Sequence, residues 1–412
     1  MITFYLTGHM TLGNRGCEAI VRSTLAILKQ EFGEVRILVP SNDIERDVEQ
    51  WKNHEMDGVF FTPIYNKFLS RLWGLVLLKF PKIGNKHFPL RIPSKLKKEL
   101  SLVDAVLSIG GDNYTYECNY PVWITMMDHY AHKLNKPTFL WSASVGPFSK
   151  NPHVRDHMSV HLSKFSKIMV REGNSFEYLT KDLQLNNVVQ TSDPAFHLKM
   201  MEVQLESFWP LPAKSGVLGF NISSLINKIK ENRLDVISEC VDFLTYCVKE
   251  KDFSIVLIPH VTPLDGSENN SDYFFMEELY KRLKIKLSNR ISLCPDGYNA
   301  EQTKYIISKC RFLYAARTHA TIASISLNIP TISIAYSQKA IGLNKDIFGH
   351  EDFVMGLDDL HMDAFKDKLS SLILNEEEVA NYLAHRVPEL KEAVSRSTNN
   401  MKKQLKVKLG KY

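Results

Sequence analysis

The chain has 412 residues, of which 44% are hydrophobic, and its formal net charge is +5. This length and apolar content are sufficient for two α/β domains with separate cores, and they exclude a single small domain. The charge is modest and scattered, which argues against a nucleic-acid-binding protein and favours local basic sites for small anions.

Neither the cysteines nor the N-terminal residues indicate a secreted protein. The six cysteines have no zinc-binding spacing, so we expect reduced thiols. The N-terminal residues lack the features of a signal peptide, and no run of about 18 apolar residues offers a membrane span. We therefore expect a cytoplasmic protein.

The first half of the chain alternates predicted strands and helices. Strands are expected over 2–8, 35–40, 104–111, 137–146 and 166–172, with helices over 17–32 and 121–135. Because these strands are near-continuous apolar runs, they are typical of a parallel sheet covered on both faces. We assign residues 1–195 to one doubly wound domain.

The second half repeats the pattern after a proline-containing linker over 208–216. Strands are expected over 216–223, 253–260, 290–295, 310–316 and 330–336, with helices over 231–250, 271–288, 299–309 and 319–328. We assign 214–375 to a second domain and 376–412 to a charged helical tail. The predicted fold class is α/β, with two Rossmann-like doubly wound domains that face a cleft and bind ligands beyond the C-terminal ends of their strands.

The segment 66–100 differs in composition from its surroundings. It combines leucines and aromatic residues with nine lysines or arginines and only one acidic residue, Glu99. One hypothesis is a patch that rests on an anionic membrane, with apolar side chains inserted and basic ones on the headgroups. The alternative is an ordinary helix docked on the N-terminal domain with its basic residues in solvent.

The stretch "RTHATIASISLNIPTISIAYSQK" contains the most informative set of cations. Arg317, Thr318 and His319 fall at a predicted turn from strand to helix, where Thr318 could cap the helix. Free N–H groups at a helix N-terminus favour an anion, and charged side chains can add hydrogen bonds to it. Lys339 follows the next strand, so we expect it at the same edge of the sheet.

The local charge supports an anion site. No Asp or Glu occurs from Gln302 through Lys345, whereas six lysines or arginines do. This balance favours a highly charged anion over a neutral sugar. The alternative is that Arg317 and His319 pair with the backbone or with distant carboxylates.

Further candidates lie in the loop that precedes the first helix. Gly13 and Gly16 permit a close approach of the backbone, Asn14 can donate or accept, and Arg15 supplies charge. The loop resembles phosphate-binding turns only loosely, because it matches neither of the glycine-rich nucleotide motifs.

Other candidates follow predicted strands. Asp112 and Asn113 come after one strand, Arg171 and Glu172 after another, and His260 after a third. Asp112 could accept a proton from a sugar hydroxyl or could simply stabilise its turn. His153, His157 and His161 share one helix face, but no cysteine or second motif accompanies them, so we expect a solvated face and no metal.

Taken in order, these motifs resemble the polysaccharide pyruvyl transferase family. The matching pieces are "GNRGCEA", "IGGD", "SVGPF", "VREGNSFEYL", "SDPAF", "GFNIS", the "PH" at 259–260 and the stretch from Arg317 to Lys339. Cys17 stands where many members have Asp, and the loop "LDGSENNSD" lacks a paired Asp that many members show.

The resemblance implies an enzyme with the B-type glycosyltransferase architecture. It implies transfer of the enolpyruvyl group of phosphoenolpyruvate to two hydroxyls of a sugar, as a ketal, on cell-surface polysaccharides or their precursors, including lipid-linked ones. Phosphoenolpyruvate is then a co-substrate, and we expect no cofactor. By position, Arg171, Arg317, His319 and Lys339 are the donor-site residues that the resemblance implies.

The chemistry of these residues suggests a mechanism. His319 would act as the acid, Arg317, Arg171 and Lys339 would hold phosphate and carboxylate, and Asp112 or Glu172 would take the sugar proton. Two alternatives remain: a glycosyltransferase that uses a nucleotide sugar, and a non-catalytic relative that binds sugars or anions.

Overall fold

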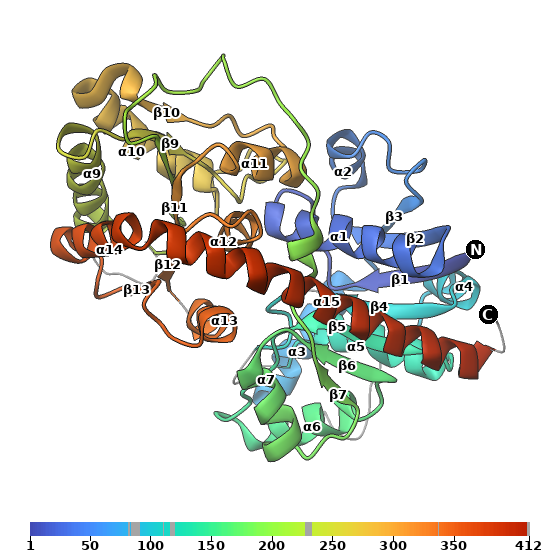
Figure 1. Cartoon of the computed structure of the whole chain (residues 1–412). Coiled ribbons are helices and arrows are strands. Elements are labelled where there is room, and N and C mark those ends of the chain that lie inside the picture. The colour runs from blue at the N-terminus through green and yellow to red at the C-terminus, as the bar shows by residue number, and fades with distance from the viewer. Residues whose placement is uncertain are drawn as a thin grey trace. The chain divides into compact units, whose positions relative to one another are not determined.

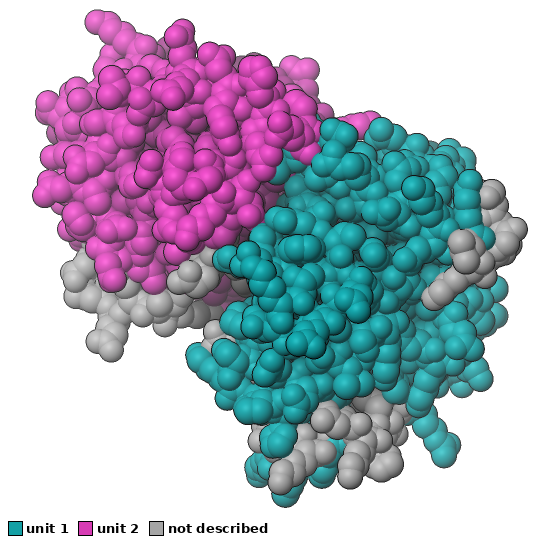
Figure 2. Space-filling view, turned by 60° about the horizontal axis from the view of Figure 1, so that its bottom comes forward, with its two compact units in different colours: residues 1–11, 24–194, 390–412 teal, residues 12–23, 195–389 magenta. Residues whose placement is uncertain are grey.

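The computed structural model describes residues 1–80, 83, 91–109, 111–115, 120–226, 233–336 and 338–409. The chain divides into two compact units, which are coloured separately in Figure 2. Unit 1 comprises Met1–Thr11, Thr24–Pro194 and Leu390–Tyr412, and unit 2 comprises Leu12–Ser23 and Ala195–Glu389. The predicted ranges 1–195, 214–375 and 376–412 differ from these units, because residues 12–23 belong to unit 2 and the last part of the tail belongs to unit 1.

Unit 1 is built on a parallel sheet with the strand order β3-β2-β1-β4-β5-β6-β7 within the described residues (Figure 1). Its strands are β1 (Ile2–Thr7), β2 (Val35–Ser41), β3 (Val59–Pro63), β4 (Ala105–Ile109), β5 (Thr138–Ala143), β6 (Lys167–Val170) and β7 (Val188–Gln190). Its helices include α2 (Ile44–Gln50), α3 (Lys67–Lys79), α4 (Ser94–Leu102), α5 (Val122–Lys133), α6 (Pro152–Leu162) and α7 (Gly173–Glu177). Strands β4 and β5 are buried along their whole length, as near-continuous apolar runs predict for a parallel sheet.

Unit 2 has its own parallel sheet, with the described strands in the order β10-β9-β8-β11-β12-β13. These strands are β8 (Val217–Asn221), β9 (Ser254–Leu257), β10 (Ile291–Leu293), β11 (Phe312–Ala315), β12 (Thr331–Ala335) and β13 (Val354–Gly356). The helices are α9 (Arg233–Lys249), α10 (Asp272–Leu287), α11 (Ala300–Ile307), α12 (Thr318–Ile325), α13 (Gln338–Phe348) and α14 (Met362–Leu374). The predicted fold class, two Rossmann-like α/β domains, is confirmed.

Each sheet has one point where the strand order reverses. The reversal falls between β1 and β4 in unit 1 and between β8 and β11 in unit 2. Loops at the carboxyl ends of the strands diverge at such a point and leave a crevice, so ligands of open α/β sheets bind there. These two edges are therefore the places to look for a site.

Two helices contain the boundary between the units. Helix α1 (Arg15–Phe32) begins in unit 2, where Glu18 accepts hydrogen bonds from Arg22 and from the backbone N–H of Ala300. Helix α15 (Glu376–Leu409) also begins in unit 2, and in unit 1 the carbonyl of Leu390 accepts a hydrogen bond from Ser192. The Glu18–Ala300 and Ser192–Leu390 contacts join residues far apart in sequence, which is why spacing alone misplaces both boundaries.

The basic segment 66–100 forms two different helices. Helix α4 buries Leu96 and Leu100 in the core, so this part is an ordinary docked helix. Helix α3 packs on α5 but keeps large apolar side chains exposed. Residues 81–82 and 84–90 of the segment lie outside the described residues.

Candidate functional site

The clearest cluster of predicted site residues lies at the β8–β11 edge of unit 2. Arg317 is the residue before α12, and its backbone N–H donates to Oδ1 of Asn221 at the end of β8, at 2.9 Å. Thr318 and His319 are the first two residues of α12. The predicted cap is wrong: Arg317 occupies the N-cap position without a side-chain cap bond, and Thr318 already lies in the helix. The N-terminal N–H groups of α12 are therefore not capped by a side chain.

Arg317 is buried and paired with a carboxylate. Its Nη2 lies 2.8 Å from Oδ1 of Asp272, and its Nε lies 3.1 Å from Oδ2. Burial alone would lower the pKa of Arg317, but the charge and hydrogen bonds of Asp272 outweigh it and raise the pKa above its usual value. The expectation that the local excess of cations is left for an external anion is thus wrong for Arg317, because Asp272 neutralises it from outside the acid-free window.

Asp272 also fixes the backbone next to His260. Its Oδ2 accepts hydrogen bonds from the backbone N–H groups of His260, at 3.2 Å, and Val261, at 2.9 Å. Arg317 therefore positions the segment after β9 through Asp272. The Arg317–Asp272 ion pair joins three elements that are separate in the sequence: the ends of β9 and β11 and the start of α10.

His260 is the most unusual side chain of the cluster. It is 3% exposed, and among the described residues neither ring nitrogen has a hydrogen-bond partner. Burial, followed by the nearby His319, Arg15 and Arg317, lowers the pKa of His260 well below its usual value, so the imidazole is neutral. A buried polar group without a partner costs about 1–3 kcal/mol, which marks the position for a role other than stability.

The glycine loop before α1 lies against the same cluster. Residues 13–15 run beside the segment after β9: Arg15 donates its backbone N–H to the carbonyl of His260 at 3.0 Å, and Thr262 donates to the carbonyl of Gly13 at 2.9 Å. A Cβ at Gly16 would lie 2.8 Å from Cγ of His319 and closer still to Nδ1. Gly16 is thus required for the His319 ring to approach the first turn of α1.

Two helix N-termini consequently meet at His319. In α1, Oδ1 of Asn14 accepts from the backbone N–H of Gly16 at 2.9 Å, which satisfies one of the free donors. In α12, His319 itself belongs to the first turn. The positive ends of two helix dipoles together favour an anion at this edge of unit 2.

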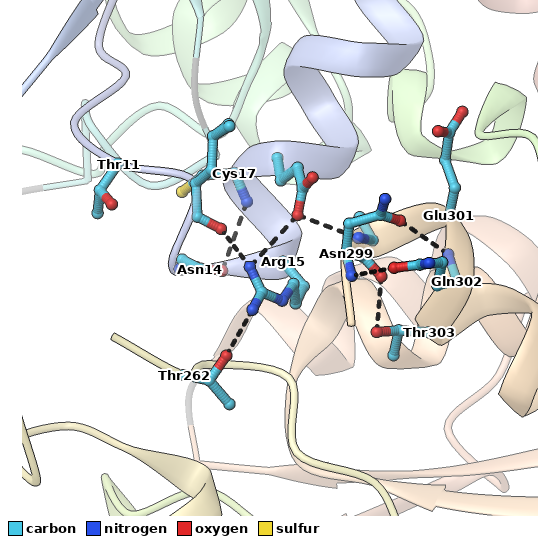
Figure 3. Close-up of polar contacts among 12 residues, drawn as sticks. Thr11, Asn14, Arg15, Cys17, Thr262, Asn299, Glu301, Gln302 and Thr303 are labelled. Atoms are coloured by element: carbon cyan, nitrogen blue, oxygen red, sulfur yellow. Dashed lines mark hydrogen bonds and ion pairs between the residues drawn. The ribbon is translucent and has the colours of Figure 1, made fainter. Parts of the chain in front are cut away.

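Arg15 is occupied by protein groups (Figure 3). Its guanidinium donates to Oγ1 of Thr262 at 2.8 Å, to the carbonyl of Leu12 at 2.8 Å and to Glu18 at 3.4 Å. Burial is the main cause that lowers the pKa of Arg15. The structure therefore gives Arg15 a role in holding the loop, not the phosphate contact predicted for it.

A second cluster lies in unit 1 around Arg171. Its guanidinium donates to Asp193 at 2.7 Å, to Asp112 at 3.1 Å and to Oγ of Ser144 at 3.0 Å. Burial alone would lower the pKa of Arg171, but these carboxylates raise it above its usual value. Glu172 lies next to it, and its buried Oε1, 3.9 Å from Nε of Arg171, accepts no hydrogen bond within the described part of the chain. Arg171, Asp112 and Glu172 are thus brought together in unit 1, separately from the unit 2 cluster.

A cavity of about 410 Å³ lies at the β1–β4 edge of unit 1. Asn113 lines it and donates to the carbonyls of Gly8 and Ile109, so it ties the ends of β1 and β4 together. The wall is largely apolar and aromatic, with cations on α3; it includes Tyr65, Tyr120, Trp123, Met127, Lys67 and Arg71. The size of this cavity and its position at the strand-order reversal are typical of a small-molecule site at a topological switch point.

The remaining predicted residues are placed as follows. The backbone of Lys339 lies in the first turn of α13, and its side chain is outside the described residues. The expected solvated histidine face is wrong for His161, which is buried and lies 3.1 Å from Asp128, a carboxylate that also accepts from Tyr114. No group of three or more potential metal ligands occurs among the described residues.

Sequence reasoning missed Asp272, Asp193 and the unit 1 cavity. Asp272 begins α10, which follows β9, and it lies 45 positions from Arg317, so no sequence spacing links the two. The available signal was that each buried cation at a strand end needs a carboxylate partner. Asp193, in the quoted "SDPAF", could have been found in this way.

Comparisons with known proteins agree with this architecture. The family model described as polysaccharide pyruvyl transferase matches residues 14–338. An S. aureus MnaA–UDP co-structure aligns with a TM-score of 0.60 at 12% identity, covering 98% of this chain and 96% of that chain. A ugt transferase from Siraitia grosvenorii in complex with UDP aligns with a TM-score of 0.59 at 10% identity, covering 98% of this chain and 100% of that chain. No curated protein matches the chain. At these identities the solved structures show the fold alone.

Proposed function

The chain belongs to the polysaccharide pyruvyl transferase family, and on that premise we propose that it transfers the enolpyruvyl group of phosphoenolpyruvate to a sugar of a polysaccharide precursor. The product would be a pyruvate ketal and the leaving group phosphate. The proposed donor is an intracellular metabolite, so we place the reaction in the cytoplasm.

One observation carries the assignment of the donor site. His260 is buried and neutral, its ring nitrogens have no hydrogen-bond partner among the described residues, and it lies beside His319 at the N-termini of α1 and α12. A trianionic donor supplies oxygen atoms for such a site, and helix N-termini favour negative charge. We therefore place phosphoenolpyruvate at the β8–β11 edge of unit 2.

The proposed roles follow from these contacts. His319 is the proposed acid, and the N–H and hydroxyl groups of Thr318 are proposed to bind phosphoenolpyruvate. Because Arg317 is paired with Asp272, we assign it mainly to positioning this edge. Lys339 keeps its predicted role in holding the donor. Because Arg171 is paired with Asp193 and Asp112 in unit 1, we assign it mainly to positioning those carboxylates.

The proposed reaction balances without an oxidant or a metal. A sugar hydroxyl adds to C2 of phosphoenolpyruvate, its proton goes to the carboxylate of Asp112 or Glu172, and His319 protonates the CH2 group. Phosphate then leaves with the electrons of its C–O bond. A second hydroxyl adds to the same carbon and gives its proton to His319, which closes the ketal and restores the acid, and the proton on the carboxylate passes to the released phosphate.

We place the acceptor in the cavity of unit 1. Aromatic and apolar walls with Lys67 and Arg71 at one side would suit a sugar whose diphosphate and lipid remain attached. A lipid-linked precursor is therefore the proposed acceptor class, and no nucleic acid takes part.

Calorimetric titration tests the donor assignment. Phosphoenolpyruvate should bind the wild-type chain and should bind the His319→Ala variant at least about tenfold more weakly, as the loss of one charge-assisted contact implies. UDP is the competing probe. Binding of UDP but not of phosphoenolpyruvate would favour a nucleotide-sugar glycosyltransferase, and binding of both without turnover would favour a non-catalytic relative.

A further inference from the structure

Helix α3 of unit 1 exposes an unusually apolar face. Its exposed apolar side chains recur at the spacing of one helix face. They are Phe68, Leu69, Leu72, Leu75 and Val76, and Phe80 continues the face just after the helix. Phe68 is 71% exposed and Leu75 is 54% exposed, so this surface has no covering element within the described chain.

The opposite face of α3 is anchored in the unit. Leu77 is buried in a core cluster that includes Tyr120 and Val122, and Ser70 and Gly74 line the 410 Å³ cavity. Because the helix is held along this side, its outward face is a fixed feature of the unit surface.

The charges on α3 are all of one sign. Lys67, Arg71 and Lys79 are exposed, and the helix contains no Asp or Glu. Among the described residues, Arg71 and Lys79 make no hydrogen bond or ion pair, and Lys67 bonds only to the amide oxygen of Asn42. An apolar face flanked by unpaired cations is complementary to an apolar surface that carries negative charge.

This charge pattern argues against a second copy of the chain as the partner. A two-fold interface would bring the same patch of both copies together, and with it their cations. No helix of the described residues is long and apolar enough to cross a bilayer. The surface therefore fits contact with the headgroups and upper acyl chains of a membrane.

We infer that α3 is a docking surface for an anionic phospholipid bilayer, with its apolar side chains inserted among the lipids and its cations on the headgroups. The inference stands on α3 alone and would hold whatever reaction the chain catalyses. Since Ser70, Arg71 and Gly74 also line the cavity of unit 1, docking would bring that cavity close to the lipid headgroups.

Co-sedimentation of the full chain with vesicles tests this. The chain should sediment with vesicles of phosphatidylglycerol and phosphatidylcholine, and much less with pure phosphatidylcholine. Leu75→Glu should lower the partition coefficient at least about tenfold, because a charge replaces an inserted apolar side chain. Arg71→Gln and Lys79→Gln should each lower it about fivefold.

A matched control excludes a general effect of surface charge. Val160 on α6 is 60% exposed, and Val160→Glu should leave vesicle binding unchanged. Circular dichroism should show that all variants are folded. Failure of the wild type to bind anionic vesicles at low salt, or equal losses in Leu75→Glu and Val160→Glu, would overturn the inference. Dimerisation that Leu75→Glu abolishes, without vesicle binding, would assign the face to a second copy.

Discussion

At the scale of single residues, the unit 2 cluster depends on a close approach that only glycine allows. The ring of His319 occupies the space that a Cβ on Gly16 would need. The backbone of the loop is fixed by its pairing with residues 260–262, so the ring must move if Gly16 is substituted.

Gly16→Ala should therefore displace His319 and reduce the rate of pyruvyl transfer. A misplacement of about 1 Å at a reacting group costs about 100-fold in rate. The measurement is phosphate release from phosphoenolpyruvate with an accepted sugar. Gly297→Ala is the matched control, since a Cβ there meets no atom within 4 Å; similar rates for both variants would argue against the proposed position of His319.

His260 makes a separate prediction about stability and pH. Its pKa is lowered by burial in the folded chain, whereas the unfolded chain binds a proton with a pKa of about 6.5. Below that pH the unfolded state holds one more proton than the folded state. The free energy of unfolding should therefore fall by about 1.4 kcal/mol, for this residue, with each unit by which the pH is lowered. His132, whose pKa burial lowers to about 4, contributes in the same direction.

Urea unfolding between about pH 7 and pH 5 measures this slope. The free energy of unfolding of His260→Gln should depend less steeply on pH than that of the wild type. The difference should correspond to about one bound proton, whatever the stability of the variant at pH 7. Identical slopes would show that His260 is protonated in the folded chain, which would contradict a neutral imidazole.

Residue types and strand ends could be predicted from the sequence, but the pairing of Arg317 with Asp272 could not. The window without Asp or Glu suggested unpaired cations, yet Arg317 within it is neutralised by Asp272. Arg171, outside that window, is likewise paired with Asp193. Parallel strands bring distant positions to one edge, so the charge near a residue in sequence is a poor guide to the charge near it in space.

At the scale of elements, α1 is the most informative. Its first turns are held in unit 2 by Glu18, which lies between Arg15 and Arg22 and accepts from the N–H of Ala300 on α11. Glu18 is fully buried, and among the described residues its charge is balanced by Arg15 and Arg22.

Glu18→Gln should destabilise the chain by about 3 kcal/mol, because it removes the ion-pair partner of buried Arg15 and one of the two partners of Arg22. Chemical denaturation measures the loss. Glu392→Gln on α15 is the control: that carboxylate forms an exposed pair with Arg396, and the change should cost less than about 0.5 kcal/mol. Equal effects would mean that the buried network does not hold α1.

Strands that form apolar runs were predicted better than elements without such a run. The central strands are apolar runs with clear bounds, whereas β7 and β13 have only three residues each and give no pattern. The composition of 66–100 indicated the exposed face of α3. The different environment of α4 could be recognised only from the burial of Leu96 and Leu100 in the structure.

At the scale of the whole molecule, two units with separate sheets were predictable from the two series of alternating strands and helices. The boundary near residue 195 was also predicted, but the boundaries within α1 and α15 were not, because both are continuous helices in sequence. The assignment of a donor edge to unit 2 and an acceptor cavity to unit 1 uses the strand-order reversal that each sheet has on its own.

The most direct test of the account is the mass of the product. The wild-type chain would be incubated with phosphoenolpyruvate and polyprenyl-diphosphate-linked saccharides, and the saccharides analysed by mass spectrometry with phosphate measured in parallel. The account predicts a gain of one pyruvyl ketal for each phosphate released, and neither with His319→Ala. Transfer of a sugar from a UDP-sugar by the same protein, with no reaction of phosphoenolpyruvate, would contradict it.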